Sequence, residues 1–494
     1  MNYTLFSTLL LLADLVIRVV LSIRVIMRKR PYGVSLAWLV VILLVPFLGG
    51  FFYLLFGENR IPERRIERAR VSYKYYHHWL KTLNQRAPVA WQTLNPECAP
   101  LHRQAESLVG LPAMAGNKLT LITKPLEITR SIIEEIEKAT STCHMQFYIW
   151  QDGGQIDRVT EALIDAAGRG VTCRLLLDSI GSHDFLGSKT AAKMQKAGIK
   201  IRESLPAGII KALFSRIDIR NHRKIVVIDG NIAFTGSQNM VDPEFFKKDA
   251  GVGNWIDIMV KAEGPVVESL AGTFISDWYL DAEEDAYHPA SMQKDIERVR
   301  QKGDIHPLPM AGQCPVQLVP SGPGFAPETI HSLLLTTIYA ARRELIMTSP
   351  YFIPDEPLLI ALKAAAQRGV EVTIIVPQKN DSRLVHYASQ ARFEELAESG
   401  VKIQLFHGGL LHSKTITVDR SFALFGSVNL DMRSFWLNFE ATLFIYCEDF
   451  TNRLLAVQQS YLDQSLALDL PSFCRRRNLT KFKENSCLLV SPLL

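Results

Sequence analysis

The sequence carries one set of chemically active residue types twice, with identical spacing. Each copy follows the pattern H-x-K-x4-D-x6-G-S-x-N. The first copy consists of His222, Lys224, Asp229, Gly236, Ser237 and Asn239, and the second of His412, Lys414, Asp419, Gly426, Ser427 and Asn429. At average residue usage, one copy arises by chance in about one chain of this length in 10^5. Two copies therefore indicate a duplicated functional unit.

The residue types in each copy suit phosphoryl transfer. His and Lys are two positions apart, so on a β-strand both side chains leave the same face. An imidazole acts as nucleophile or as general acid and base near neutral pH, and a lysine ammonium is a point charge for phosphate. Ser and Asn add neutral hydrogen-bond donors. Two such sets facing each other would surround one tetrahedral anion, and we expect this site to need no metal or other cofactor.

A longer repeat surrounds the two motifs and predicts the elements that position them. Amphipathic helices over residues 132–139 and 330–341 each lead into an apolar strand, over residues 145–150 and 345–352. A second helix and strand follow in both halves, and both halves then contain a Gly-initiated third strand. Helices alternating with short apolar strands indicate an α/β fold. The two histidines are 412 − 222 = 190 residues apart, a plausible size for one repeat.

Both motifs resemble the double H-K-D signature of the phospholipase D superfamily. Further runs resemble bacterial cardiolipin synthases in particular, and the similarity extends from the N-terminal apolar segments to about residue 470. These runs are residues 239–243 (NMVDP), 254–257 (NWID), 264–265 (GP), 277–278 (DW) and 429–440 (NLDMRSFWLNFE). The resemblance implies two phospholipase D-like α/β sandwich repeats that form one catalytic unit behind an N-terminal membrane-anchoring helical hairpin.

The resemblance also implies roles at the site. One histidine attacks phosphorus to form a phosphohistidine, and the other protonates the leaving alcohol and deprotonates the incoming one. We assign His222 as nucleophile and His412 as general acid and base, although the near-equivalence of the copies leaves the reverse assignment open. Phosphate binding is expected from Lys224, Lys414, Asn239 and Asn429, with help from the hydroxyls of Ser237 and Ser427 to the phosphate or to the histidine turn.

A nucleophilic histidine needs an acceptor for its other ring nitrogen. Glu440 lies 440 − 412 = 28 residues after one histidine, and Asp257 lies 257 − 222 = 35 residues after the other, a difference that an insertion in residues 243–253 explains. We predict that each carboxylate orients the histidine of its own repeat. Asp229 and Asp419 belong to the motif, but each ends an apolar strand and is expected to have a scaffold role. Arg223 is interpreted as a flanking charge.

Two apolar stretches at the N-terminus predict membrane association. Residues 5–26 contain Asp14, Arg18 and Arg24, whereas residues 34–56 contain no charged residue. Each is long enough to cross a bilayer as a helix, and an interfacial helix is the alternative for the first. Asp14 and Arg18 are spaced to form an ion pair. Basic residues are more numerous after the second stretch than between the two, which weakly favours a cytoplasmic catalytic region in an inner-membrane protein.

Composition sets looser bounds on the chain. It has 494 residues and a net charge of +5, which suits an anionic membrane surface and a solvated basic face equally well. None of the seven cysteines forms a pair with zinc-ligand spacing, and we expect reduced, structural thiols. We divide the chain into membrane segments (1–60), a basic helix and connector (61–115), a first repeat (116–310) and a second repeat (311–494).

These features together predict a phosphatidyltransferase that makes cardiolipin and glycerol from two phosphatidylglycerol molecules. A hydrolytic phospholipase D, or a transferase with another alcohol acceptor, shares the same motifs. A nuclease is disfavoured by the apolar segments and by the lack of aromatic residues among basic clusters at the motifs, so no nucleic-acid partner is expected. A non-catalytic membrane scaffold is disfavoured because both motifs are complete. The expected partners are phosphatidylglycerol and anionic membrane lipids, and the sequence leaves the oligomeric state open.

Overall fold

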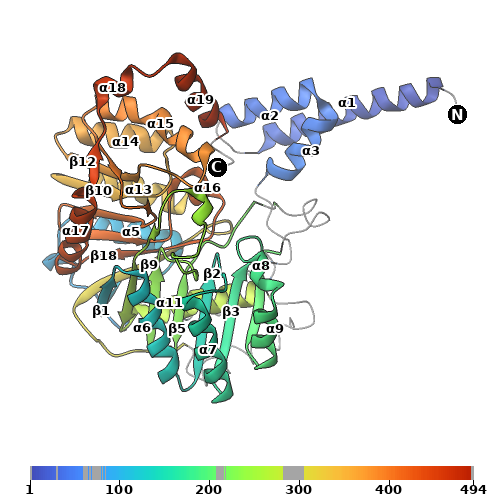
Figure 1. Cartoon of the computed structure of the whole chain (residues 1–494). Helices are drawn as coiled ribbons and strands as arrows, with labels where there is room; N and C mark the ends of the chain where they lie inside the picture. The colour runs from blue at the N-terminus through green and yellow to red at the C-terminus, as the bar shows by residue number, and fades with distance from the viewer. Residues whose placement is uncertain are drawn as a thin grey trace. The chain divides into compact units, whose positions relative to one another are not determined.

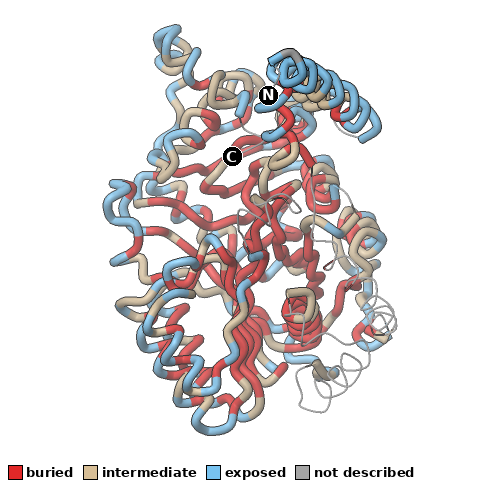
Figure 2. Tube along the Cα trace, turned by 90° about the vertical axis from the view of Figure 1, so that its right-hand side faces the viewer, coloured by how far each residue is buried: buried red, intermediate tan, exposed pale blue. Residues whose placement is uncertain are grey.

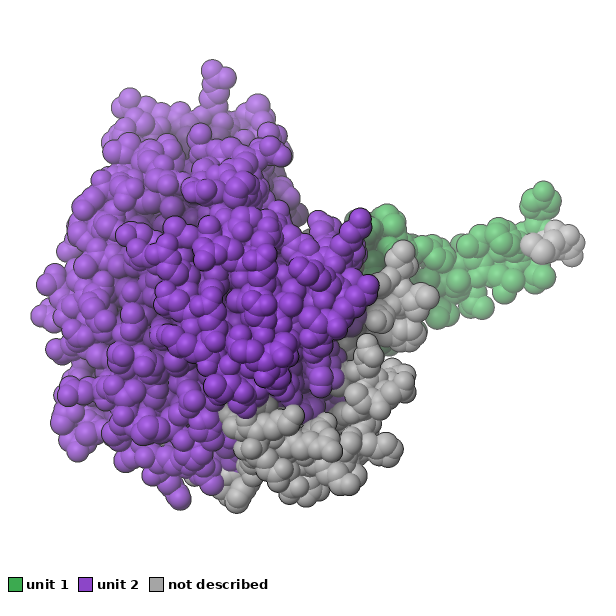
Figure 3. Space-filling model, turned by 60° about the horizontal axis from the view of Figure 1, so that its bottom comes forward, with its two compact units in different colours: residues 1–66, 207–219 green, residues 67–206, 220–494 purple. Residues whose placement is uncertain are grey.

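The computed structural model forms two compact units (Figure 3). Unit 1 comprises residues 1–66 and 207–219, and unit 2 comprises residues 67–206 and 220–494. The structure describes residues 3–28, 32–58, 65, 68, 79, 82–83, 85–206, 216, 218–281, 305–326 and 328–490. The basic helix predicted to begin at residue 61 lies largely outside the described residues.

Unit 1 contains three helices: α1 (Tyr3–Met27), α2 (Tyr32–Leu44) and α3 (Pro46–Phe56). The prediction of one continuous helix over residues 34–56 is wrong, because the helix breaks at Val45, whose φ of −134° and ψ of 71° are not helical. Pro46 lacks an N–H and disfavours helical geometry in the residue before it. Among the described residues, no helix has both the length and the apolar character needed to cross a bilayer.

Charged groups of unit 1 pair within the unit. The predicted pair is present, with 2.7 Å between Arg18 Nε and Asp14 Oδ2, and the Arg18 guanidinium also donates to the Leu43 carbonyl at the end of α2. Arg24 donates from Nε to Glu58 at 2.7 Å. By contrast, much of the apolar surface of these helices is exposed, including Leu11 at 72%. Unit 1 therefore pairs its charges with one another and leaves many leucine side chains exposed.

Unit 2 is built around one mixed β-sheet whose two halves repeat the same strand arrangement (Figure 1). The first half has the order β4-β3-β2-β5-β6-β8-β1, and the second has β13-β12-β10-β15-β16-β18-β9 with β19 on its outer edge. Strands β1 and β9 join the halves in antiparallel register, with Asn117 opposite Cys314. The strands are β1 (Met114–Ile122), β2 (Thr142–Phe147), β3 (Thr172–Asp178), β4 (Lys200–Ser204), β5 (Ile225–Ile228), β6 (Ile232–Gly236), β8 (Met259–Glu263), β9 (Cys314–Ser321), β10 (Glu344–Thr348), β12 (Glu371–Pro377), β13 (Lys402–Phe406), β15 (Thr415–Val418), β16 (Phe422–Gly426), β18 (Glu440–Ile445) and β19 (Ser465–Ala467).

Amphipathic helices cover the sheet and recur in the same places in both halves. Each buries one apolar face, so the strands are buried while the outer turns of the helices are exposed (Figure 2). Helices α6 and α13, and then α7 and α14, match the predicted repeat. The principal helices are α5 (Cys98–Val109), α6 (Pro125–Lys138), α7 (Gln155–Gly168), α9 (Lys189–Lys196), α11 (Val266–Leu280), α13 (Thr329–Ala340), α14 (Glu356–Gln367), α15 (Arg383–Glu398), α17 (Glu448–Leu462) and α19 (Asn478–Leu489).

Short contacts outside the main sheet link the halves beside the two motifs. Strand β7 (Trp255–Ile256) of the first half pairs in parallel with β14 (Leu410–Leu411) of the second. In the same way, Asn221, which precedes the motif of the first half, forms a parallel bridge with Phe439 of the second half. The residue before each motif histidine is therefore tied to a segment of the other half.

A disulfide joins Cys314 at the start of β9 to Cys447 before α17, with 5.4 Å between the Cα atoms. The expectation of reduced thiols is wrong for this pair. The other five cysteines are free, and Cys98, Cys143 and Cys173 among them are buried.

Candidate active site

The two motif histidines precede equivalent strands, His222 before β5 and His412 before β15. Their residues are only 7% and 2% exposed. The following lysines curl back along the strand, so that Lys224 Nζ donates to the His222 carbonyl at 2.8 Å and Lys414 Nζ to the His412 carbonyl at 2.5 Å. Each motif thus holds an imidazole and an ammonium at the same end of a buried strand.

Each histidine is held by a carboxylate from the other repeat. Glu440 Oε2 lies 2.9 Å from His222 Nδ1, and Asp257 Oδ1 lies 2.7 Å from His412 Nδ1. The predicted pairing within each repeat is therefore wrong, although both carboxylates do contact a histidine. The exchange follows from the backbone contacts between the halves, because His222 N donates to Phe439 O and His412 N donates to Ile256 O, both at 2.9 Å.

The two serines bind these carboxylates. Ser237 Oγ donates to Asp257 Oδ1 at 2.6 Å, and Ser427 Oγ donates to Glu440 Oε2 at 2.5 Å. In the described residues neither hydroxyl bonds to the histidine turn, and phosphate binding by the two serines stays a prediction. A carboxylate that accepts from both a hydroxyl and an imidazole has its orientation fixed by two bonds. The site thus contains two equivalent Ser-carboxylate-His chains.

Burial dominates the electrostatics of the site. It lowers the pKa of both His222 and His412 to about 4, against the opposing effect of their carboxylates. It also lowers the pKa of Lys414 to about 8, and lowers that of Lys224. The lysine of each motif affects the histidine of the other, which places both motifs in one electrostatic environment. At pH 7 both imidazoles are therefore neutral, and each can accept a bond or a proton.

Two asparagines complete the motifs. Asn239 and Asn429 are 1% and 4% exposed. The Asn239 carbonyl accepts from Ile149 N at 3.2 Å, which leaves its amide group as a donor for an anion. Asn429 donates from its backbone N to Ser434 Oγ at 3.3 Å.

The two motif aspartates lie at the far ends of their strands. Asp229 accepts from the backbone N–H groups of Ser141 and Thr142, each at 2.8 Å. Asp419 does the same for Arg343 and Glu344, at 2.7 and 2.8 Å. Each aspartate therefore holds the chain at the start of the neighbouring strand, β2 or β10, and does not contact the histidines.

Arg223, interpreted from the sequence as a flanking charge, is a buried clamp on the site. It is 1% exposed and pairs with Asp277, with 2.5 Å between Nη1 and Oδ2. Its Nε donates to the Glu440 carbonyl at 2.9 Å, and its Nη2 donates to the Ser321 carbonyl at 3.2 Å. The equivalent position in the second motif is Ser413, so comparison of the two motifs did not indicate a role for Arg223.

Aromatic rings that the motif search also missed flank both histidines. The Tyr148 ring lies 5.2 Å from His222, and the Trp255 ring lies 4.4 Å from His412. Trp255 stands in the run NWID noted in the sequence, which is the one signal that pointed to it. These rings help to exclude water from the imidazoles and so contribute to their lowered pKa.

We expect Arg223→Met to lower the free energy of unfolding by about 3–5 kcal/mol, because it breaks a buried ion pair with Asp277 and removes the donors to the Glu440 and Ser321 carbonyls. Denaturant unfolding measures this change. Arg158→Met, which alters an exposed arginine on α7, is the matched control and should change stability little. Equal effects of the two substitutions would contradict the clamp role.

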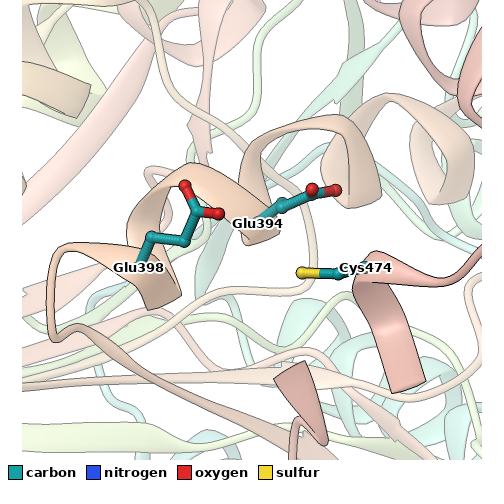
Figure 4. Close-up of side chains that lie close together, drawn as sticks. All are labelled: Glu394, Glu398 and Cys474. Atoms are coloured by element: carbon teal, nitrogen blue, oxygen red, sulfur yellow. The ribbon is translucent and has the colours of Figure 1, made fainter. Parts of the chain in front are cut away.

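Two cavities lie outside the histidine pair. One, of about 440 Å³, is lined by residues that include Trp150, Asp152 and Lys247, and another, of about 340 Å³, is lined by residues that include His386 and Phe393. Within the described part of the chain, Glu394, Glu398 and Cys474 are the group whose ligand atoms gather closely enough to hold a metal ion (Figure 4). Lys481 and Arg476 already pair with Glu394, at 3.1 and 3.3 Å, so this group is an ion-pair cluster and not a metal site.

The duplicated α/β fold and the paired His-Lys motifs define a phospholipase D-type phosphotransfer protein. The model of the cardiolipin synthase phospholipase D-like domain matches residues 132–278 and 334–461, and that of the phospholipase D-nuclease N-terminal region matches residues 16–58. The chain belongs to the bacterial cardiolipin synthases of the phospholipase D superfamily.

Curated relatives match over the full length. The chain is 42% identical to cardiolipin synthase A of Yersinia pseudotuberculosis serotype O:1b (strain IP 31758), over 100% of this chain and 99% of the relative. The identity and coverage are the same for cardiolipin synthase A of Yersinia pestis bv. Antiqua (strain Angola). Among solved structures, the phosphatidylserine synthase of Haemophilus influenzae Rd KW20 aligns with a TM-score of 0.60 and 17% identity, covering 80% of this chain and 100% of that chain, and shows a shared fold.

Proposed function

We propose that this protein transfers the phosphatidyl group of one phosphatidylglycerol to a second, giving cardiolipin and glycerol. The observation that carries the proposal is the facing pair of His-Lys motifs, each oriented by a buried carboxylate. The full-length similarity to cardiolipin synthases A supports phosphatidylglycerol as both donor and acceptor. Two histidines divide the reaction into two displacements at phosphorus, and so no other activated donor is needed.

In the first step, His222 Nε2 attacks phosphorus, because Glu440 already occupies Nδ1. The bond from phosphorus to the glycerol oxygen breaks, and His412 gives its proton to that oxygen. The lysines and the amide groups of the asparagines bind the non-bridging oxygens and stabilise their increased charge.

In the second step, His412 removes the proton from a hydroxyl of the second phosphatidylglycerol. That oxygen attacks the phosphohistidine, and His222 leaves as neutral imidazole. The net reaction consumes two phosphatidylglycerols, forms one cardiolipin and one glycerol, and restores both histidines. Water as the second nucleophile would instead give phosphatidic acid.

Mass spectrometry of lipids after incubation with phosphatidylglycerol alone tests the proposal. Detergent-solubilised wild type is expected to form cardiolipin and glycerol, and His222→Ala and His412→Ala to form neither. Phosphatidic acid without cardiolipin would identify a hydrolase. Cardiolipin from either variant at the wild-type rate would exclude the histidine mechanism.

The pH dependence should differ between the free enzyme and the substrate complex. In the free enzyme the pKa of His412 is about 4, so the general acid is unprotonated at pH 7. An anionic phosphodiester beside it raises that pKa, because it favours the charged imidazolium. We therefore expect the basic limb of kcat to lie at higher pH than the basic limb of kcat/KM. Coincident limbs in a pH series with mixed micelles would show that the substrate does not supply this shift.

The proposal places the protein at the bacterial inner membrane with unit 2 on the cytoplasmic face. The exposed apolar surfaces of α1, α2 and α3 support lipid contact, and six basic residues between positions 60 and 74 support the cytoplasmic side. The Cys314–Cys447 disulfide favours the opposite side, because the cytoplasm keeps thiols reduced. Alkylation of this pair in intact cells tests the assignment, because a pair that resists alkylation would place unit 2 on the opposite face.

A further inference from the structure

The last helix of the chain, α19, carries an exposed apolar stripe. Leu479, Phe482 and Leu489 are 65%, 68% and 83% exposed. Their spacing of three and seven residues places them on one face of the helix. An amphipathic helix of a soluble protein normally turns such a face toward the core.

The opposite face of α19 is already used for packing. Cys487 and Leu488 pack against a small cluster that includes Ile353 and Val385 of the second repeat. Glu484, only 1% exposed, pairs with Arg476 at 2.9 Å. Because this inner face fixes the helix against α15, the outer stripe is held in solvent by the fold.

Basic side chains border the stripe. Arg475, Arg477 and Lys483 are exposed, and none of them forms an ion pair with a described acidic residue. Their neighbours Arg476 and Lys481 differ, because both pair with Glu394. An apolar stripe with a basic border fits the surface of an anionic bilayer, where the cations meet phosphate groups and the apolar side chains enter the acyl boundary.

A short series of contacts links α19 to the active site. Tyr351 packs against the same cluster as Leu488, and its hydroxyl donates to Asp381 at 2.9 Å. Asp381 pairs with Lys247 of the first repeat at 2.9 Å. The Lys247 ammonium lies 5.4 Å from the centre of the Trp255 ring, and Trp255 packs on His412. These contacts connect the packing of α19 to the residues beside His412.

Three further exposed apolar residues occur near Lys247 and Asp381, in the sequence or in the lining of one cavity. Ile180 follows β3 and is 50% exposed, Phe245 follows β6 and is 62% exposed, and Leu384 begins α15 and is 49% exposed. Phe245 is two residues from Lys247, in the insertion that distinguishes the first repeat from the second. We call these three residues and the α19 stripe the lipid rim.

We propose that the lipid rim docks unit 2 directly onto an anionic bilayer, so that a phosphatidylglycerol headgroup enters the site while its acyl chains stay in the membrane. This contact is separate from any anchoring by unit 1, and its substrate rests on the proposed function. The basic border selects anionic lipid, and the apolar stripe sets how deeply α19 enters the bilayer.

Photolabelling of the full-length protein tests the contact without relying on activity. The probe is phosphatidylglycerol with a diazirine in its acyl chain, mixed into phosphatidylcholine vesicles. Adducts are expected in peptides covering residues 478–490 and 243–253 as well as in unit 1. They should be absent from the peptide containing Met310, which is 61% exposed but precedes the end of β9 remote from the site. Adducts confined to residues 3–56 would overturn the proposal.

A double variant separates docking from chemistry. Leu479→Asp with Phe482→Asp is expected to lower kcat/KM on phosphatidylglycerol vesicles about tenfold, because two apolar side chains no longer leave water. Its activity on dispersed short-chain phosphatidylglycerol should stay at the wild-type level, which also shows that it folds. Met310→Asp is the matched control and should leave both activities unchanged.

The possible outcomes are distinguishable. Equal losses on vesicles and on dispersed substrate, or no loss on either, would overturn docking by the rim. If the wild type makes no cardiolipin but labels at residues 478–490, the docking surface stands and the proposed reaction fails. Crosslinks from residues 478–490 to a second copy, in place of lipid adducts, would mean that the stripe is a protein interface.

Discussion

Given a phosphatidyl ester of p-nitrophenol, His412→Ala is expected to release one equivalent of p-nitrophenol in a burst and then stop, whereas His222→Ala releases none. Nitrophenolate leaves without a proton, so the first displacement no longer needs the general acid. The second displacement still needs a base to activate the incoming alcohol. The covalent phosphatidyl group is therefore expected to remain on His222, where peptide mass spectrometry locates it.

The same experiment distinguishes the two histidine assignments. A burst from His222→Ala, with the adduct on His412, would reverse the roles while leaving the two-step mechanism in place. Continuous turnover in both variants would exclude a covalent histidine. His407→Ala, which changes an exposed histidine of the second repeat outside both motifs, is the matched control and should turn over like the wild type.

The crossed carboxylates predict an equally large and more selective effect. Because Glu440 holds His222, Glu440→Gln is expected to slow the burst itself by roughly two to four orders of magnitude. Asp257→Asn acts on His412, so it should leave the burst rate nearly unchanged and slow the steady state by a similar factor. Pre-steady-state kinetics with the nitrophenyl ester measures both rates.

A pairing within each repeat predicts the opposite pattern, in which Asp257→Asn removes the burst and Glu440→Gln spares it. Ser427→Ala provides a graded control, because it removes only the hydroxyl bond that steadies Glu440. We expect it to slow the burst far less than Glu440→Gln. In the double variant Ser427→Ala with Glu440→Gln, the serine effect should disappear, since the two residues act as one unit.

The sequence predicted the composition of the site because its signals are local. The motifs lie within 18 residues in each copy, and the α/β repeat is visible from apolar periodicity. The carboxylate partners could be selected by residue type, but their pairing could not. That pairing depends on the contact of β7 with β14, between residues about 155 apart in the chain. Spacing along the chain carries no information on which half supplies a partner.

Other differences between the predicted and the observed structure also arise from contacts that the local sequence does not show. Arg223 was interpreted as a flanking charge, because only tertiary structure places Asp277 and the Glu440 carbonyl around it. Residues 34–56 are apolar, as the composition indicated. The break at Val45 was missed because the effect of Pro46 on the preceding residue was not considered. The disulfide joins cysteines 133 residues apart, a separation from which no pairing can be read.

The exchange of carboxylates between repeats also sets the order in which the enzyme becomes competent during its synthesis. When a ribosome has released the first repeat, that repeat holds His222 without Glu440 and Asp257 without His412. Until residue 440 has been added, the nascent chain therefore lacks the carboxylate that orients its nucleophile. Activity begins only when residue 440 has emerged and β18 has formed, so a truncated translation product cannot cleave the phospholipids around it.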